Sequence, residues 1–214
     1  IIVTPNNPTA LSVLREDILK LARRLERHDC RLIVDESFIE FSRVGVLGSV
    51  EKMVEHCQNL VVIKSMSKVF GVAGVRLGYL LSADRAFIAA VRSSLPIWNI
   101  NGLAEEFLRT VGRYRREFAN SCDFTRTTCQ ELYRDLLTIP GIEPIEPDAN
   151  FILCKLTDPS ALGSEVARRL YVEHNILIKD CTVKSMPDAD RYLRIASRTP
   201  NENDHLVRVL SGMF

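Results

Sequence analysis

The chain has 214 residues, of which 46% are hydrophobic and 26% are charged, as in ordinary globular proteins. Its formal net charge of +1 gives no bulk attraction for nucleic acid or an anionic membrane, so we expect neither as a partner. No apolar run approaches the roughly 18 residues that a membrane helix requires. The six cysteines form no C-x-x-C pair and no zinc-type spacing with histidine. The sequence therefore predicts no metal site, and it predicts reduced thiols in a cytoplasmic protein.

Residues 1–100 alternate predicted strands with predicted helices. Ser12 is the expected N-cap of a helix over residues 13–27, where apolar side chains recur at helical spacing. Short apolar runs suit strands that are buried on both faces of a parallel sheet. These runs predict strands at 31–35, 60–64 and 77–81. A helix is expected at 50–56, between the first two strands, and another at 83–93, after the third. The rhythm predicts an α/β layered domain.

The pattern changes after residue 100, which predicts a second, smaller domain over 101–214. A single helix is expected from about residue 101 to 137, because apolar residues repeat there about every 3.5 positions. Pro140 and Gly141 end it. Beyond this turn the sequence predicts strands at 151–155, 176–178 and 192–196 and helices at 163–172 and 202–210. This is an α+β pattern.

The densest group of chemically useful residues runs from Ser65 to Tyr79, directly after a predicted strand. The hydroxyls of Ser65 and Ser67 and the guanidinium of Arg76 suit a phosphate, which arginine can grip with two hydrogen bonds. Glycines in the same stretch let the backbone approach a ligand closely. Lys68, beside such a loop, could act as a phosphate ligand or as an amine nucleophile. The stretch does not match the Walker loop pattern.

This stretch resembles the lysine motif S-x-S-K-x-F-G-x-x-G-x-R-x-G of the fold-type I pyridoxal 5'-phosphate (PLP) enzymes, the class I and II aminotransferases. It looks closest to the branch of histidinol-phosphate aminotransferase and threonine-phosphate decarboxylase, and the resemblance covers essentially the whole chain. It implies the second half of a PLP-binding large domain, mainly parallel sheet with helices, followed by a small α+β C-terminal domain. It also implies PLP as the cofactor, Lys68 as its Schiff-base lysine, and Ser65, Ser67 and Arg76 as ligands of its phosphate.

A second segment, residues 4–9 (TPNNPT), is similar to the family's N-P-x-N-P-T-G turn. The resemblance implies that Asn7 hydrogen-bonds the ring oxygen of the cofactor. Ala10 stands where the family usually has Gly. The residues alone also fit an ordinary turn. The Asn7–Pro8 bond is a candidate cis peptide, since proline makes that isomer accessible.

A third segment, residues 34–41, resembles the family's D-E-A-Y/F segment. The resemblance implies that Asp35 pairs with the protonated pyridine nitrogen, because a carboxylate there keeps the ring a strong electron sink. Phe38 stands where aminotransferases usually have Tyr, and it lacks the hydroxyl that assists the ring oxygen. Phenylalanine at this position is more similar to the threonine-phosphate decarboxylase branch.

In the second half, residues 192–196 look like the strand that carries the family's substrate-carboxylate arginine, which implies this role for Arg194. Arg198 stands where aminotransferases of the branch more often have Gly, and a second arginine suits a substrate with an additional anion. Asn150 and Lys179 lie in segments similar to the family's substrate-facing loops.

The resemblance implies a PLP-dependent aminotransferase that acts on a small amino acid or amine, with or without a phosphate, and a 2-oxo acid. Lys68 would then move a proton as general base and acid. Phe38 and Arg198 keep a decarboxylase as the alternative, and a non-catalytic module that retains the fold is a third interpretation. A homodimer is expected by resemblance. The family's phosphate-binding helix start and ring-stacking aromatic lie upstream of the Asn-Pro turn, so we expect a longer or fused chain of which this part holds an incomplete cofactor site.

Overall fold

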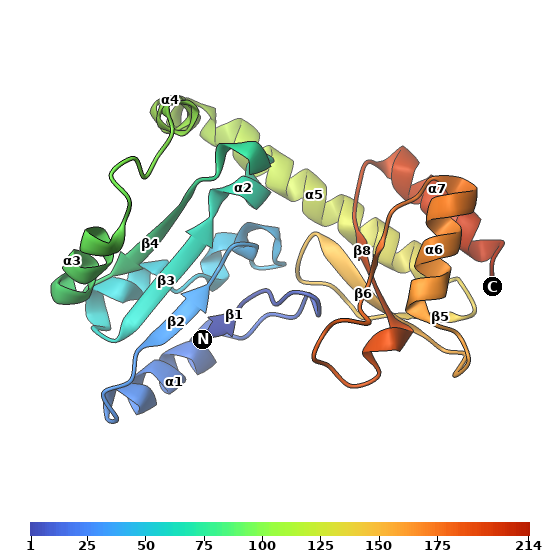
Figure 1. The fold of residues 1–214 in the computed structure, drawn as a ribbon, viewed down its shortest axis with the longest axis horizontal. Coiled ribbons are helices and arrows are strands. Elements are labelled where there is room, and N and C mark those ends of the chain that lie inside the picture. The colour runs from blue at the N-terminus through green and yellow to red at the C-terminus, as the bar shows by residue number, and fades with distance from the viewer. The chain divides into compact units, whose positions relative to one another are not determined.

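A computed structural model describes residues 1–214, which form two compact units (Figure 1). The first unit comprises Ile1–Asn6 and Ser12–Cys122, and the second comprises Asn7–Leu11 and Asp123–Phe214. The division falls within the long helix α5 (Arg115–Leu136). None of the helices combines the length and the apolar character that a membrane span needs.

The first unit contains a four-stranded mixed sheet in the order β1-β2-β3-β4. Strands β1 (Ile2–Val3), β2 (Leu32–Asp35) and β3 (Leu60–Ser65) are parallel, and β4 (Gly78–Ser82) pairs antiparallel with β3. The expected strands are therefore confirmed, within a residue or so at their ends. The α/β class is also confirmed, and the antiparallel strand lies at one edge of the sheet.

The core of the first unit forms where helix α1 (Arg15–Glu26) packs on the sheet. Ile18 and Ala22 of α1 are fully buried against alternate residues of β2 and β3, which include Val34 and Val62. The prediction that Ser12 caps this helix was wrong. The helix begins two residues later than expected, at Arg15, because the Val13 N–H donates to Thr4 Oγ1 (3.0 Å) and the chain is still extended at Leu14.

The remaining helices of the first unit correct two further expectations. The helix expected over 50–56 is a 3-10 helix, Glu51–His56. The single helix expected over 101–137 is two α-helices, α4 (Gly102–Val111) and α5, joined by a 3-10 turn at Gly112–Tyr114. Glycine is the weakest helix former after proline, so the interruption falls at Gly112. The other helices are Ile39–Phe41, Gly45–Gly48, α2 (Met66–Val69), Ala73–Val75 and α3 (Arg85–Ser94).

The second unit is built on an antiparallel sheet in the order β5-β6-β8-β7. Its strands are β5 (Ile142–Pro144), β6 (Phe151–Leu156), β7 (Lys179–Asp180) and β8 (Tyr192–Ala196). Helix α5 packs on this sheet together with α6 (Gly163–His174) and α7 (Pro200–Ser211), and a short 3-10 helix (Ala189–Arg191) precedes β8. Apolar side chains from all three α-helices share one core with β6 and β8.

The strand predicted at 176–178 was wrong, because these residues follow α6 directly and Ile176 helps to cap its end. Asn175 adopts a left-handed conformation (φ 57°), and the Ile176 N–H donates to the Leu170 carbonyl (3.0 Å). This is the usual way to terminate a helix when its last carbonyls need donors. Ile176 and Ile178 are apolar because they pack on the core, and the sequence pattern could not distinguish that from a strand.

Candidate functional site

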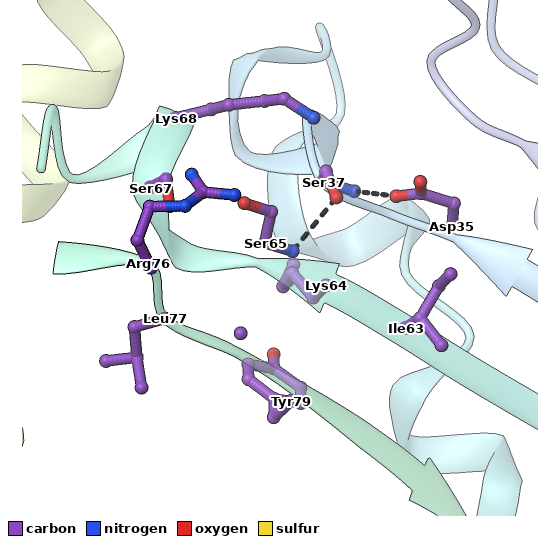
Figure 2. Close-up of a pocket in the computed structure, with 11 residues that line it drawn as sticks. Asp35, Ser37, Ile63, Lys64, Ser65, Ser67, Lys68, Arg76, Leu77 and Tyr79 are labelled. Atoms are coloured by element: carbon purple, nitrogen blue, oxygen red, sulfur yellow. Dashed lines mark hydrogen bonds between the residues drawn. The ribbon is translucent and has the colours of Figure 1, made fainter. Parts of the chain in front are cut away.

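An open hollow of about 360 Å³ lies in the first unit, where β2 and β3 end (Figure 2). Parallel strands bring their carboxyl ends to the same edge of a sheet, and ligands commonly bind there. The structure thereby brings together five residues that the sequence singled out: Asp35, Ser65, Ser67, Lys68 and Arg76. The other lining residues are Ser37, Ile63, Lys64, Leu77, Gly78 and Tyr79.

Lys68 lies on the short helix α2, which begins directly after Ser65 at the end of β3. Figure 2 shows its side chain extended along the hollow. Its ammonium group lies 4.5 Å from the centre of the Phe38 ring, within reach of a cation–π contact. Phe70 follows α2 and stacks on Phe118 with ring centres 4.2 Å apart, so aromatic packing holds this segment in place.

Arg76 occupies a strained backbone position at the edge of the hollow. Its φ of 58° is left-handed, a region that costs a side chain on the order of 1 kcal/mol. Its guanidinium donates to the Ala73 carbonyl (3.2 Å), and Figure 2 shows it on the same side of the hollow as Ser65 and Ser67. Backbone strain in a non-glycine residue is common at ligand sites, where the surrounding structure compensates for it. A cation and two hydroxyls therefore gather at this end of the hollow.

Asp35, the last residue of β2, and Ser37, two residues beyond it, lie toward the other end of the hollow. The Ser37 N–H donates to Asp35 Oδ1 (2.9 Å), and Ser37 Oγ accepts a hydrogen bond from the Ser65 N–H (2.9 Å), as Figure 2 shows. Ser37 is 4% exposed. Ser37 was not predicted as a site residue. The available signal was the D-E-S order of this segment, which departs from the D-E-A of the family it resembles.

An ionic cluster around the buried Lys64 borders the hollow, and it was not predicted from the sequence either. Lys64 Nζ lies 2.7 Å from Glu40 Oε1 and 3.1 Å from Glu51 Oε1, and the Tyr79 hydroxyl donates to Glu51. Burial alone would lower the pKa of Lys64, but Glu40 and Glu51 raise it above its ordinary value. The available signal was a lysine within an otherwise apolar strand.

Glu36, between Asp35 and Ser37, points away into the protein and is fully buried. It accepts hydrogen bonds from the Ser49 hydroxyl (2.5 Å) and the Val50 N–H (2.7 Å). Burial raises the pKa of this carboxyl, and these two hydrogen bonds offset part of the rise. Glu36 thus ties the end of β2 to the segment that carries Glu51.

Arg194 and Asn7 lie together in the second unit. Arg194 is in β8, and its guanidinium donates to Asn7 Oδ1 (2.9 Å) and lies 5.3 Å from the centre of the Phe151 ring. The Arg194 Nε and the Asn150 Oδ1 are both buried without a hydrogen-bond partner. Unpaired buried groups of this kind are rare and often mark a ligand site. The Asn7–Pro8 bond is cis, as the sequence suggested.

Arg198 and Lys179 are placed differently from Arg194. The Arg198 guanidinium makes two hydrogen bonds to Glu202 Oε1 (3.3 and 3.1 Å), and its side chain is 69% exposed. Lys179 lies on the edge strand β7 and is exposed. Arg198 is therefore apart from the group formed by Arg194 and Asn7, whereas Lys179 is the cross-strand neighbour of Arg194.

Comparison with known proteins identifies the class of enzyme. Residues 1–210 match the sequence model of the aminotransferase class I and II family, the family of PLP-dependent enzymes that the lysine motif resembles. The chain belongs to this family.

Three relatives illustrate the range of the family. CMP-5'-(3-aminopropyl)phosphonate synthase of Streptomyces rubellomurinus is 41% identical over 99% of this chain and 33% of its own length. L-serine phosphate decarboxylase of Campylobacter jejuni is 31% identical over 100% of this chain and 55% of its own. A solved decarboxylase from Sulfurospirillum multivorans is 30% identical with a TM-score of 0.89, over 99% of this chain and 60% of that one. The chain thus spans between 33% and 60% of the length of these relatives.

The cofactor of this family is pyridoxal 5'-phosphate. A histidinol-phosphate aminotransferase of Sinorhizobium meliloti, solved with PLP bound, has the same fold (TM-score 0.83, 20% identity, 98% of this chain and 55% of that one). The donors of the hollow fit PLP, since Arg76, Ser65 and Ser67 suit a phosphate and Asp35 suits a protonated pyridine nitrogen. The amine of Lys68 is exposed to the same hollow.

Proposed function

We propose that the full-length protein is a PLP-dependent decarboxylase of a small amino acid that carries a phosphate or phosphonate group. The observation that carries this proposal is Phe38, which is 8% exposed and lies against Lys68 with no hydroxyl to offer the cofactor ring. The sequence resemblance associates phenylalanine here with the decarboxylase branch. Two of the relatives above are decarboxylases, and a third is named for an aminopropylphosphonate.

In this proposal the hollow of the first unit holds the cofactor. Ser65, Ser67 and Arg76 bind its phosphate with two hydroxyls and a guanidinium. Asp35 Oδ1 is occupied by the Ser37 N–H, which leaves Oδ2 for the pyridine nitrogen. PLP, when bound, withdraws electrons from the bonds at the substrate Cα.

Lys68 has two roles in this proposal. Its amine anchors the cofactor covalently before the substrate arrives, and it then returns a proton to the substrate carbon as general acid. The contact with the Phe38 ring keeps the amine in an apolar setting on one side.

We assign substrate recognition to Arg194, together with Asn7 and Asn150. Arg194 donates one hydrogen bond to Asn7, but its buried Nε has no partner. The guanidinium therefore has a donor that is still available for a ligand. A guanidinium of this kind can hold an anionic group of the substrate in a fixed orientation. For Arg198 to contribute, it would have to exchange Glu202 for the substrate anion.

Transamination, the first expectation from the sequence, is the second candidate. The match to the aminotransferase family over residues 1–210 favours it, and the same residues would serve it. The two reactions differ in which bond at Cα stands perpendicular to the cofactor ring.

The test is product analysis on the full-length protein loaded with PLP. O-phosphoserine, O-phosphothreonine and a phosphonate analogue, each labelled in the carboxyl carbon, are compared with serine and threonine. Decarboxylation predicts labelled CO₂ and amine in equal amounts without an added 2-oxo acid, for the phosphorylated or phosphonate substrates only. Transamination predicts a new 2-oxo acid that appears only with an acceptor and no released label. Neither product from any substrate would contradict both candidates, and Lys68→Ala is the inactive control.

A further inference from the structure

Ser37 occupies the point where the parallel ladder between β2 and β3 stops. The last main-chain hydrogen bond of that ladder runs from the Glu36 N–H to the Ile63 carbonyl (3.0 Å). The next donor on β3 that faces β2 is the Ser65 N–H, and it donates to Ser37 Oγ (2.9 Å) rather than to a carbonyl. The side chain therefore replaces a main-chain acceptor where the chain leaves β2.

Ser37 contacts both ends of the hollow at once. Its N–H fixes Asp35 Oδ1, and its Oγ fixes the main chain of Ser65, so one residue links the carboxylate end to the phosphate end (Figure 2). The side chain is 4% exposed, which limits competition from water for this hydrogen bond. Alanine would keep the contact to Asp35, which uses the main chain, and would lose only the contact to Ser65.

We propose that Ser37 is a positioning residue that holds Ser65, and through it the start of α2, in the geometry that binds the phosphate of PLP. This inference rests on the proposed placement of the cofactor in the hollow. Ser37 acts through Ser65 and does not itself need to touch the cofactor. Its contribution is confined to the phosphate end, because the hydrogen bond to Asp35 survives without the hydroxyl.

The test compares two ligands that differ only in the phosphate. The apo form of the full-length protein is titrated with PLP and with pyridoxal, and binding is followed by the visible absorption of each. Ser37→Ala is expected to weaken PLP binding by about 3- to 10-fold, the effect of one hydrogen bond, and to leave pyridoxal binding unchanged. Ser37→Thr keeps the hydroxyl and should restore PLP affinity.

Two control variants frame the result. Ser67→Ala should also weaken PLP selectively, because its hydroxyl is assigned to the phosphate itself. Ser93→Ala, on the exposed face of α3, should change neither ligand. The melting temperature of each apo variant shows whether the fold is retained, and Ser37→Thr supplies the comparison if Ser37→Ala fails to fold.

An equal loss for both ligands would overturn the inference, since the hydroxyl would then act on the hollow as a whole. No loss for either ligand would overturn it as well. If the wild-type protein binds PLP but not through Lys68, the proposed function fails, and that is seen before any Ser37 variant is made. If the wild type binds PLP through Lys68 and Ser37→Ala binds PLP with the same affinity, only the role of Ser37 is contradicted.

Discussion

The two sheets of the molecule place their chemistry in different ways. In the first unit, parallel strands end at one edge, so the residues that follow them converge on a single hollow. In the second unit the strands are antiparallel, and Arg194 lies within β8 between Leu153 and Lys179 of its neighbours. Sites built from strand ends can therefore be predicted from short motifs, whereas a residue within an antiparallel sheet acquires its role from longer-range contacts.

The largest effect is expected on the stability of the fold, and it is tested by comparing one lysine from each sheet. Lys64 in β3 has 5% of its side chain exposed and pairs with Glu40 and Glu51, whereas Lys155 in β6 is 31% exposed and lies 3.9 Å from an exposed Asp188. Lys64→Met should lower the free energy of unfolding by about 3–5 kcal/mol, because it removes the cation that pairs with the buried Glu40. Lys155→Met should lower it by less than about 1 kcal/mol. Urea unfolding followed by circular dichroism measures both, and similar losses would show that the Lys64 cluster is not buried as described.

The second prediction compares two arginines. Arg76→Met removes the cation from the hollow and should weaken PLP binding by about 10- to 150-fold, the effect of about 1.5–3 kcal/mol from a hydrogen bond to a charged group. Arg208→Met, on the exposed face of α7, should leave PLP affinity unchanged. Absorption titration of the full-length protein gives both dissociation constants. If Arg76→Met binds PLP as tightly as the wild type, the proposal that the phosphate lies at this end of the hollow is contradicted.

The sequence predicted much of the hollow because its residues are nearly contiguous. Ser65, Ser67, Lys68 and Arg76 come from one stretch, and Asp35 ends the neighbouring strand, so a motif and a strand order were sufficient to place them together. Some of the residues that support them come from the segment between the two strands. The Lys64 cluster joins the strand to Glu40 and Glu51, and no local pattern marks such a pairing.

The errors in the fold have the same origin. The strand expected at 176–178 and the helix start expected at Ser12 depended on how neighbouring segments satisfy their hydrogen bonds. Ile176 caps α6, and Val13 bonds to Thr4, which precedes it by nine positions. Apolar spacing reports which side chains are buried, but it does not report which backbone groups already have partners.

The smallest effect concerns the thiols of the two units. Cys30 in the first unit is exposed, whereas Cys129, Cys154 and Cys181 in the second are buried. Burial raises the pKa of Cys129 to about 12, so almost none of it is thiolate near neutral pH. A disulfide reagent at pH 8 should therefore modify Cys30 within minutes, but Cys129, Cys154 and Cys181 only after denaturant is added. Rapid reaction of the buried thiols in the folded protein would show that the second unit opens readily.

The central claim is that Lys68 anchors PLP in the hollow of the first unit. The most direct measurement is borohydride reduction of the full-length protein after incubation with PLP, followed by proteolysis and mass spectrometry of the lysine-containing peptides. The account predicts a stable phosphopyridoxyl group on Lys68 and none on the neighbouring Lys64, with the modification absent in Lys68→Ala. A modification on another lysine, or on none while the protein is folded, would contradict it.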